Sequence, residues 1–151
     1  MKPDEIFAHW KQVRAGLVTM VGRFTEAELA YIPFDGAWPV GQIMLHIAEA
    51  EEGWFRYIVM RELDAWSDQY TLENYPWKED ILEALAEVHW HTEQYLATLK
   101  EEDLPMLITA PRGEVLLLNW IIWHVIEHEI HHRGELSLIL GMLGREGWGA
   151  E

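Results

Sequence analysis

The chain has 151 residues, of which 50% are hydrophobic, and it contains no cysteine. This length predicts a single domain over residues 1–151, and the lack of cysteine excludes disulfides, thiolate metal ligands and a cysteine nucleophile. Eleven basic against 26 acidic side chains give a net charge of −15, which opposes binding to nucleic acid or to an anionic membrane surface. The sequence shows neither a secretion signal nor an apolar run long enough to cross a membrane, so we expect a soluble cytoplasmic protein.

Apolar residues recur at three- and four-residue steps in four segments, and this spacing predicts amphipathic helices. The predicted helices cover residues 4–22, 39–61, 77–99 and 114–143. The segments between them contain proline and glycine and predict connections, with one helical turn at 25–29 and an extended stretch at 106–109. A glycine-rich tail is predicted at 144–151. Four helical segments without a convincing strand pattern predict an all-α four-helix bundle with long connections.

Four of the eight histidines lie within nine residues of the last predicted helix, in a strongly apolar context. His128 and His132 are four residues apart and share a helix face, so their rings can converge on one ion. A single pair at this spacing is also compatible with histidines that are simply hydrogen-bonded in the core. Several buried imidazoles on one helix each need partners for two ring nitrogens, however, and this demand favours a cation. His46, midway along the second predicted helix, is the candidate third ligand.

The remaining histidines are weaker candidates. His124 shares roughly the face of His128 and is a rival ligand one turn further along the helix. His131 points partly away from that face and is expected at the surface or in support of a ligand. Three histidines lack a partner at ligand spacing and are expected to be structural or exposed: His9, His89 and His91.

Residues 128–132 also match the H-E-x-x-H pattern of zinc peptidases, with Glu129 as the general base. So short a pattern recurs by chance, and a peptidase usually has a strand beside its cleft, which the sequence does not predict. Glu129 and His132 also match half of a di-iron site, but a second such element is absent from the sequence. The peptidase hypothesis therefore ranks third.

Gly134 lies inside the last predicted helix, where glycine costs about 1 kcal/mol relative to alanine. Its presence predicts either the close approach of another backbone or space for a ligand. Arg133 and Glu135 are expected at the surface or beside the site. Glu127 or Glu49 could orient a ligating ring nitrogen.

Two segments, 40–51 and 123–136, resemble the two signature helices of the DinB (DNA-damage-inducible) family and its YfiT-like relatives. The resemblance extends over nearly the whole chain, and its specific part is H-x-x-x-H followed by Arg-Gly. It implies a four-helix bundle of up-up-down-down topology, often dimeric, so we expect a homodimer. It also implies a divalent metal ion, commonly zinc or nickel, held by His46, His128 and His132. The family name does not imply binding to DNA.

Some members of this superfamily resemble S-transferases or isomerases that use a low-molecular-weight thiol, so the resemblance implies a small-molecule substrate. The leading hypothesis is a metal-dependent enzyme that transfers such a thiol to an electrophile, with the metal favouring the thiolate. One alternative is a hydrolase that uses a metal-activated water. Another is a non-catalytic metal-binding stress protein, whose fourth coordination position His124 or a carboxylate would fill. Catalytic residues beyond the ligands are not predicted.

Overall fold

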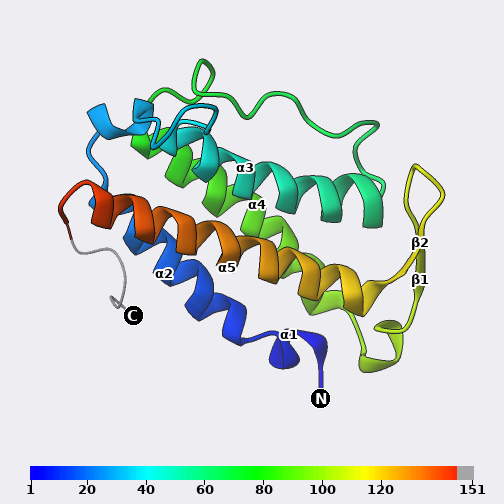
Figure 1. Cartoon of the computed structure of the whole chain (residues 1–151). Coiled ribbons are helices and arrows are strands. Elements are labelled where there is room, and N and C mark those ends of the chain that lie inside the picture. Colours follow the sequence, from blue (N-terminus) through cyan, green and yellow to red (C-terminus); the bar gives the residue numbers. More distant parts are fainter. Residues whose placement is uncertain (146–151) are drawn as a thin grey trace.

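The computed structural model describes residues 1–145, which form a bundle of helices (Figure 1). The α-helices are α1 (Pro3–Ile6), α2 (His9–Arg23), α3 (Val40–Glu52), α4 (Lys78–Thr98) and α5 (Leu118–Met142). Shorter segments are the 3-10 turns η1 (Ala27–Ala30) and η3 (Glu101–Asp103) and the π-helical segment η2 (Gly53–Val59), which continues α3. The predicted all-α bundle is therefore confirmed. Most of the predicted glycine-rich tail lies outside the described residues.

The first and last predicted helices differ from the observed ones at their N-terminal ends. The helix predicted over 4–22 is divided at Phe7, whose buried ring packs edge-on against Trp123 with centroids 5.2 Å apart. The helix predicted from Glu114 begins only at Leu118.

The residues before α5 form a small hairpin instead. Strand β1 (Leu107–Thr109) pairs with β2 (Val115–Leu117) in an antiparallel arrangement, with Ile108 opposite Leu116. Gly113, with φ of +96°, supplies the positive φ between the strands. The extended stretch predicted at 106–109 is thus confirmed, whereas the expectation of no strand is wrong.

The four long helices run up, down, down and up in chain order (Figure 1). Helices α2 and α5 are therefore parallel to each other and antiparallel to α3 and α4. This corrects the expected up-up-down-down order. Parallel helices that follow one another need a connection that returns along the bundle, and residues 60–77 form this long crossover between α3 and α4. No helix within residues 1–145 has the length and apolar character needed to cross a membrane.

The buried side chains form two apolar clusters, one towards each end of the bundle. One cluster combines the end of α2, the starts of α3 and α4 and the end of α5. The other combines the opposite ends of the same helices with α1, η2 and the hairpin. Along each long helix, a polar residue separates the part in one cluster from the part in the other: Arg14, Glu51, His89 and Glu129.

These four polar residues form one buried network across the bundle. The Arg14 guanidinium donates to both oxygens of Glu129, at 2.7 and 3.2 Å, and also to a carboxylate oxygen of Glu51. Trp10 Nε1 donates to Glu129 at 3.0 Å, and His89 Nδ1 lies 2.7 Å from Glu51. Burial alone raises the pKa of Glu51, but the charge of Arg14 and the hydrogen bond with His89 outweigh it and lower that pKa to about 2. The network fixes α5 against α2, α3 and α4.

A candidate metal centre between two helices

His46 on α3 and His128 and His132 on α5 bring their rings together where these helices pack. Nε2 of His128 lies 3.0 Å from Nε2 of His46 and 3.1 Å from Nε2 of His132. One nitrogen from each of the three residues lies within 4.8 Å of the others. Three imidazole nitrogens around one point are the protein ligands of open divalent metal sites. The structure therefore gathers all three predicted residues, although His46 precedes His128 by 82 positions.

Two of the three rings each have a glutamate carboxylate beside their Nδ1 atom. Oε2 of Glu49 lies 3.1 Å from Nδ1 of His46, and Oε2 of Glu135 lies 3.0 Å from Nδ1 of His132. An Nδ1–H that donates to a carboxylate leaves the Nε2 lone pair free to bind a metal and fixes the ring orientation. Glu49 thus occupies the orienting position considered for it, whereas Glu127 is exposed on α5.

The surroundings of His128 and His132 favour their neutral rings. Burial, reinforced by the neighbouring histidines, lowers the pKa of His128 to about 3. Burial also lowers the pKa of His132, against the opposing influence of Glu135. Because the Nδ1 atoms of His46 and His132 face carboxylates, their Nε2 lone pairs converge beside His128. A cation satisfies such convergent lone pairs, so the donor set fits a divalent metal ion.

The rival histidine, His124, lies outside this group. Its ring stacks on Trp120 with centroids 4.7 Å apart and an interplanar angle of 9°, and it meets the edge of Trp54 at 5.1 Å. His131 is exposed, and its Nε2 lies 2.8 Å from Glu135. The expectations for the other three also hold: His89 belongs to the buried network, His9 is exposed and His91 is partly buried on α4.

Glu129 cannot serve as the base that the H-E-x-x-H pattern suggests. Its side chain is 1% exposed, and its carboxylate is bonded to Arg14 and Trp10 in the buried network. One residue along an α-helix corresponds to a rotation of about 100°, which turns Glu129 away from the histidine rings and into the bundle. The pattern in residues 128–132 therefore combines a ligand pair with a structural carboxylate.

Among the residues after His132, Glu135 lies beside the site, as expected. A Cβ added at Gly134 would meet no heavy atom within 4 Å among the described residues, so no close backbone approach requires this glycine. Arg133 instead reaches α2, where its Nη1 lies 3.4 Å from the carbonyl oxygen of Val13. A Cβ at Gly16 would lie 2.9 Å from the same Nη1 atom, so Gly16 leaves room for this arginine.

An apolar cavity of about 410 Å³ adjoins the group of three histidines at His132, which lines it. Part of its wall is the chain before α3, whose Trp38 ring meets the ring of His46 with centroids 4.8 Å apart. The other part is the last half of α5, beginning with His132 and Glu135. Among the described residues, its lining contains no lysine or arginine: Pro33, Phe34, Ala37, Trp38, Ile43, His132, Glu135, Leu138, Ile139 and Met142. The cavity is large enough for a small, mainly apolar molecule.

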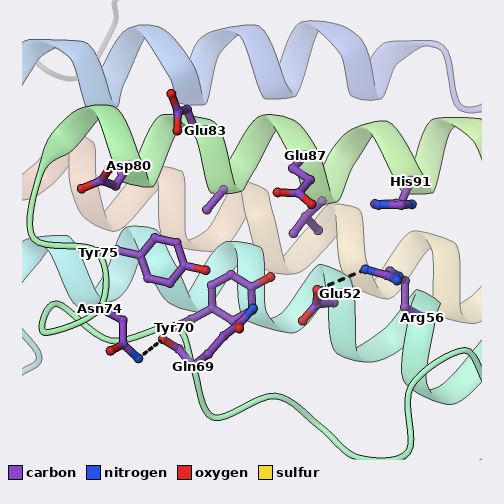
Figure 2. Close-up of a pocket in the computed structure, with 12 residues that line it drawn as sticks. Glu52, Arg56, Gln69, Tyr70, Asn74, Tyr75, Asp80, Glu83, Glu87 and His91 are labelled. Atoms are coloured by element: carbon purple, nitrogen blue, oxygen red, sulfur yellow. Dashed lines mark hydrogen bonds and ion pairs between the residues drawn. The ribbon is translucent and has the colours of Figure 1, made fainter.

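A second, polar cavity of about 310 Å³ lies between α3, α4 and the long crossover, and it shares no residue with the histidine group. Figure 2 shows the stacked Tyr70 and Tyr75 beside carboxylates of both helices. Glu52 is paired there with Arg56 at 3.6 Å, and Asn74 donates to the carbonyl oxygen of Gln69 at 2.9 Å. Its chemistry is that of a solvated acidic surface rather than of a metal centre.

The DinB superfamily profile matches residues 9–136. The chain is 28% identical over 143 residues to the uncharacterized protein YizA of Bacillus subtilis, a match that covers 89% of this chain and 83% of YizA.

Several solved structures share the fold. A DinB-like protein from Bacillus cereus matches all of both chains with a TM-score of 0.78 at 16% identity. YfiT from Bacillus subtilis, described as a probable metal-dependent hydrolase with an unusual four-helix bundle topology, gives a TM-score of 0.66 at 24% identity over 92% of this chain and 87% of YfiT. A mycothiol-dependent maleylpyruvate isomerase gives 0.63 at 12% identity over 87% of this chain and 60% of the isomerase. At these identities the structural matches show a common fold.

Proposed function

The chain belongs to the DinB superfamily, and from this premise we propose that it is a divalent-metal-dependent enzyme with His46, His128 and His132 as the ligands. One observation carries the proposal: the three Nε2 atoms converge next to an apolar cavity that His132 lines, and carboxylates contact the Nδ1 atoms of two of the rings. Zinc and nickel both suit an imidazole ligand set. When bound, the ion would supply a Lewis acid that lowers the pKa of a nucleophile at its open position.

The side chains around the histidines define the kind of substrate. Phe34 and Trp38, both exposed, form an aromatic wall on one side, and Leu138 and Met142 face them from α5. These residues would bind an apolar electrophile and exclude water from the reacting atoms. Because the cavity lining has no lysine or arginine among the described residues and is mainly apolar, the part of the substrate that it holds would carry no anionic group.

We propose a low-molecular-weight thiol as the nucleophile. A thiolate is far more nucleophilic than its thiol, and a divalent ion favours the deprotonated form. The sulfur would attack an electrophile held in the cavity. The fold shared with a mycothiol-dependent isomerase supports this choice.

Water is the second candidate nucleophile, which would make the protein a hydrolase. The specific observation in its favour is the same lack of a lysine or arginine in the cavity lining, since thiols that carry carboxylates gain from such a partner. The description of YfiT as a probable metal-dependent hydrolase agrees with it. A purely structural ion is less well supported, because His124 stacks on Trp120 and Glu49 and Glu135 already engage Nδ1 atoms.

The two chemistries are separated by one set of assays. The protein loaded with zinc or nickel is given an apolar electrophile with and without a small thiol, and then apolar esters and amides without thiol. Turnover that requires the thiol supports the transferase, and turnover without it supports the hydrolase. His128→Ala should abolish either activity. The absence of both activities in the loaded protein would contradict the enzymatic proposal. Light scattering on the same sample measures whether the chain forms the expected homodimer.

A further inference from the structure

We infer that Trp66 is a positioning residue of the metal centre, because its indole N–H fixes the carboxylate of Glu49 and thereby the ring of His46. The inference rests on the proposed metal site. Trp66 lies in the long crossover after η2, about twenty positions from His46 in sequence but joined to it by two consecutive hydrogen bonds.

The two oxygens of one carboxylate carry the connection. Trp66 Nε1 donates to Oε1 of Glu49 at 3.0 Å, and Oε2 of the same group lies 3.1 Å from Nδ1 of His46. A carboxylate held at both oxygens keeps its plane and direction. The Nδ1–H of His46 therefore has a fixed acceptor, and its Nε2 lone pair keeps a fixed direction towards His128.

Glu49 needs this second contact because its side chain is 25% exposed. A partly exposed glutamate on a helix surface has several rotamers and competing water molecules. The other orienting carboxylate shows the same arrangement, since Glu135 contacts His132 through Oε2 and His131 through Oε1 at 2.8 Å. Each orienting carboxylate thus has one partner in the histidine group and one outside it. Trp66 is the outside partner for Glu49.

Gly53 makes room for Trp66. A Cβ at this position would lie 2.6 Å from carbon atoms of the indole ring, closer than side chains can approach. The ring therefore lies directly against the helix backbone where α3 passes into η2. Trp54 and Tyr57 meet the ring edge-on, with centroids 6.4 and 6.5 Å away. An alanine at Gly53 must displace the indole and with it the donor to Glu49.

The test measures metal affinity by competition between the purified protein and a chromogenic chelator, with zinc as the probe. Trp66→Phe keeps an aromatic ring but removes the N–H donor, and loss of such an outer contact typically weakens metal binding about 10- to 100-fold. Gly53→Ala should weaken it in the same direction without changing any polar group. Trp54→Phe is the matched control, because it removes an indole from the same aromatic cluster, but one that donates no hydrogen bond to Glu49. This variant should bind zinc as the wild type does.

Two further measurements distinguish positioning from general damage to the fold. In a Glu49→Ala background, Trp66→Phe should have no additional effect on zinc affinity, because Trp66 acts through Glu49. The visible spectrum of the cobalt-loaded protein should change in Trp66→Phe and not in Trp54→Phe. Equal zinc affinity in the two tryptophan variants, or an undiminished effect without Glu49, overturns the inference while leaving the metal site intact. A wild-type protein without measurable zinc affinity overturns the inference and the proposed function together.

Discussion

Replacement of Arg14 by methionine tests the buried polar network that holds α5 in place. The Arg14 side chain is 8% exposed, and the side chains of Glu51 and Glu129, which it contacts, are each 1% exposed. Arg14→Met removes the cation, keeps much of the volume and leaves two carboxylates buried without it. Loss of one partner from a buried ion pair typically costs about 3–5 kcal/mol. Among the influences that lower the pKa of Glu51 against the effect of burial, the charge of Arg14 is the largest, so its removal should raise that pKa.

The assay is urea unfolding at pH 7, evaluated by linear extrapolation, with Arg112→Met as the control. Arg112 lies on the exposed loop of the hairpin, so the same substitution there should change the free energy of unfolding by less than about 0.5 kcal/mol. Arg14→Met should lower the free energy of unfolding by about 3–5 kcal/mol. This is a large part of the total for a typical domain, which is about 5–15 kcal/mol.

The difference in stability between Arg14→Met and the wild type should depend on pH. In the wild type the pKa of Glu51 is lowered, so its contribution to stability is complete above pH 4.5 and is lost as the pH falls towards 2. In Arg14→Met a buried carboxylate without its cation favours the protonated form. Acidification from pH 7 to 5 should therefore stabilise the variant relative to the wild type and narrow the difference between them. A loss no larger than that of Arg112→Met, or a difference that does not change with pH, would refute the reasoning.

Other substitutions test the assignment of the carboxylates near the histidines. Glu129→Gln should lower the free energy of unfolding by about 1–3 kcal/mol but keep the wild-type metal content. Loss of a general base typically lowers activity about 10²- to 10⁴-fold, and the activity per bound ion of this variant should fall far less than that. An activity loss of that size would instead support the peptidase hypothesis, in which Glu129 is the general base. Glu135→Gln should weaken zinc binding about 10- to 100-fold, because it removes the charge behind His132, whereas the exposed Glu127→Gln should not. Equal affinities in a chelator competition would show that Glu135 does not orient the ring.

The sequence predicts those parts of the fold that depend on helical periodicity. The four long helices appear close to their predicted places because each carries an apolar stripe over several turns. Of the hairpin before α5, only the extended stretch at 106–109 is predicted. The second strand and the pairing escape prediction, since strands of three residues are too short for an alternating pattern. Periodicity also does not predict the order of the helix directions, because an apolar stripe defines which face of a helix is buried and not which neighbouring helix covers it.

The candidate site also has features that the sequence predicts and features that only the structure shows. The spacing of His128 and His132 predicts a shared face, and the structure places both rings there. The inward direction of Glu129 becomes clear only when Arg14 is seen opposite it. Trp66 lies in a connection without periodicity, so no pattern in the sequence links it to Glu49. Contacts across elements of this kind require the folded chain.

The most direct test of the central claim is the metal content of the purified protein and its histidine variants after incubation with zinc or nickel and removal of unbound ions. The wild type should retain a bound ion, and His46→Ala, His128→Ala and His132→Ala should each lose it. His124→Ala, which alters a histidine on the same helix that stacks on Trp120, should retain it. Undiminished metal in any of the three variants, or its loss in His124→Ala alone, would contradict a metal centre formed by His46, His128 and His132.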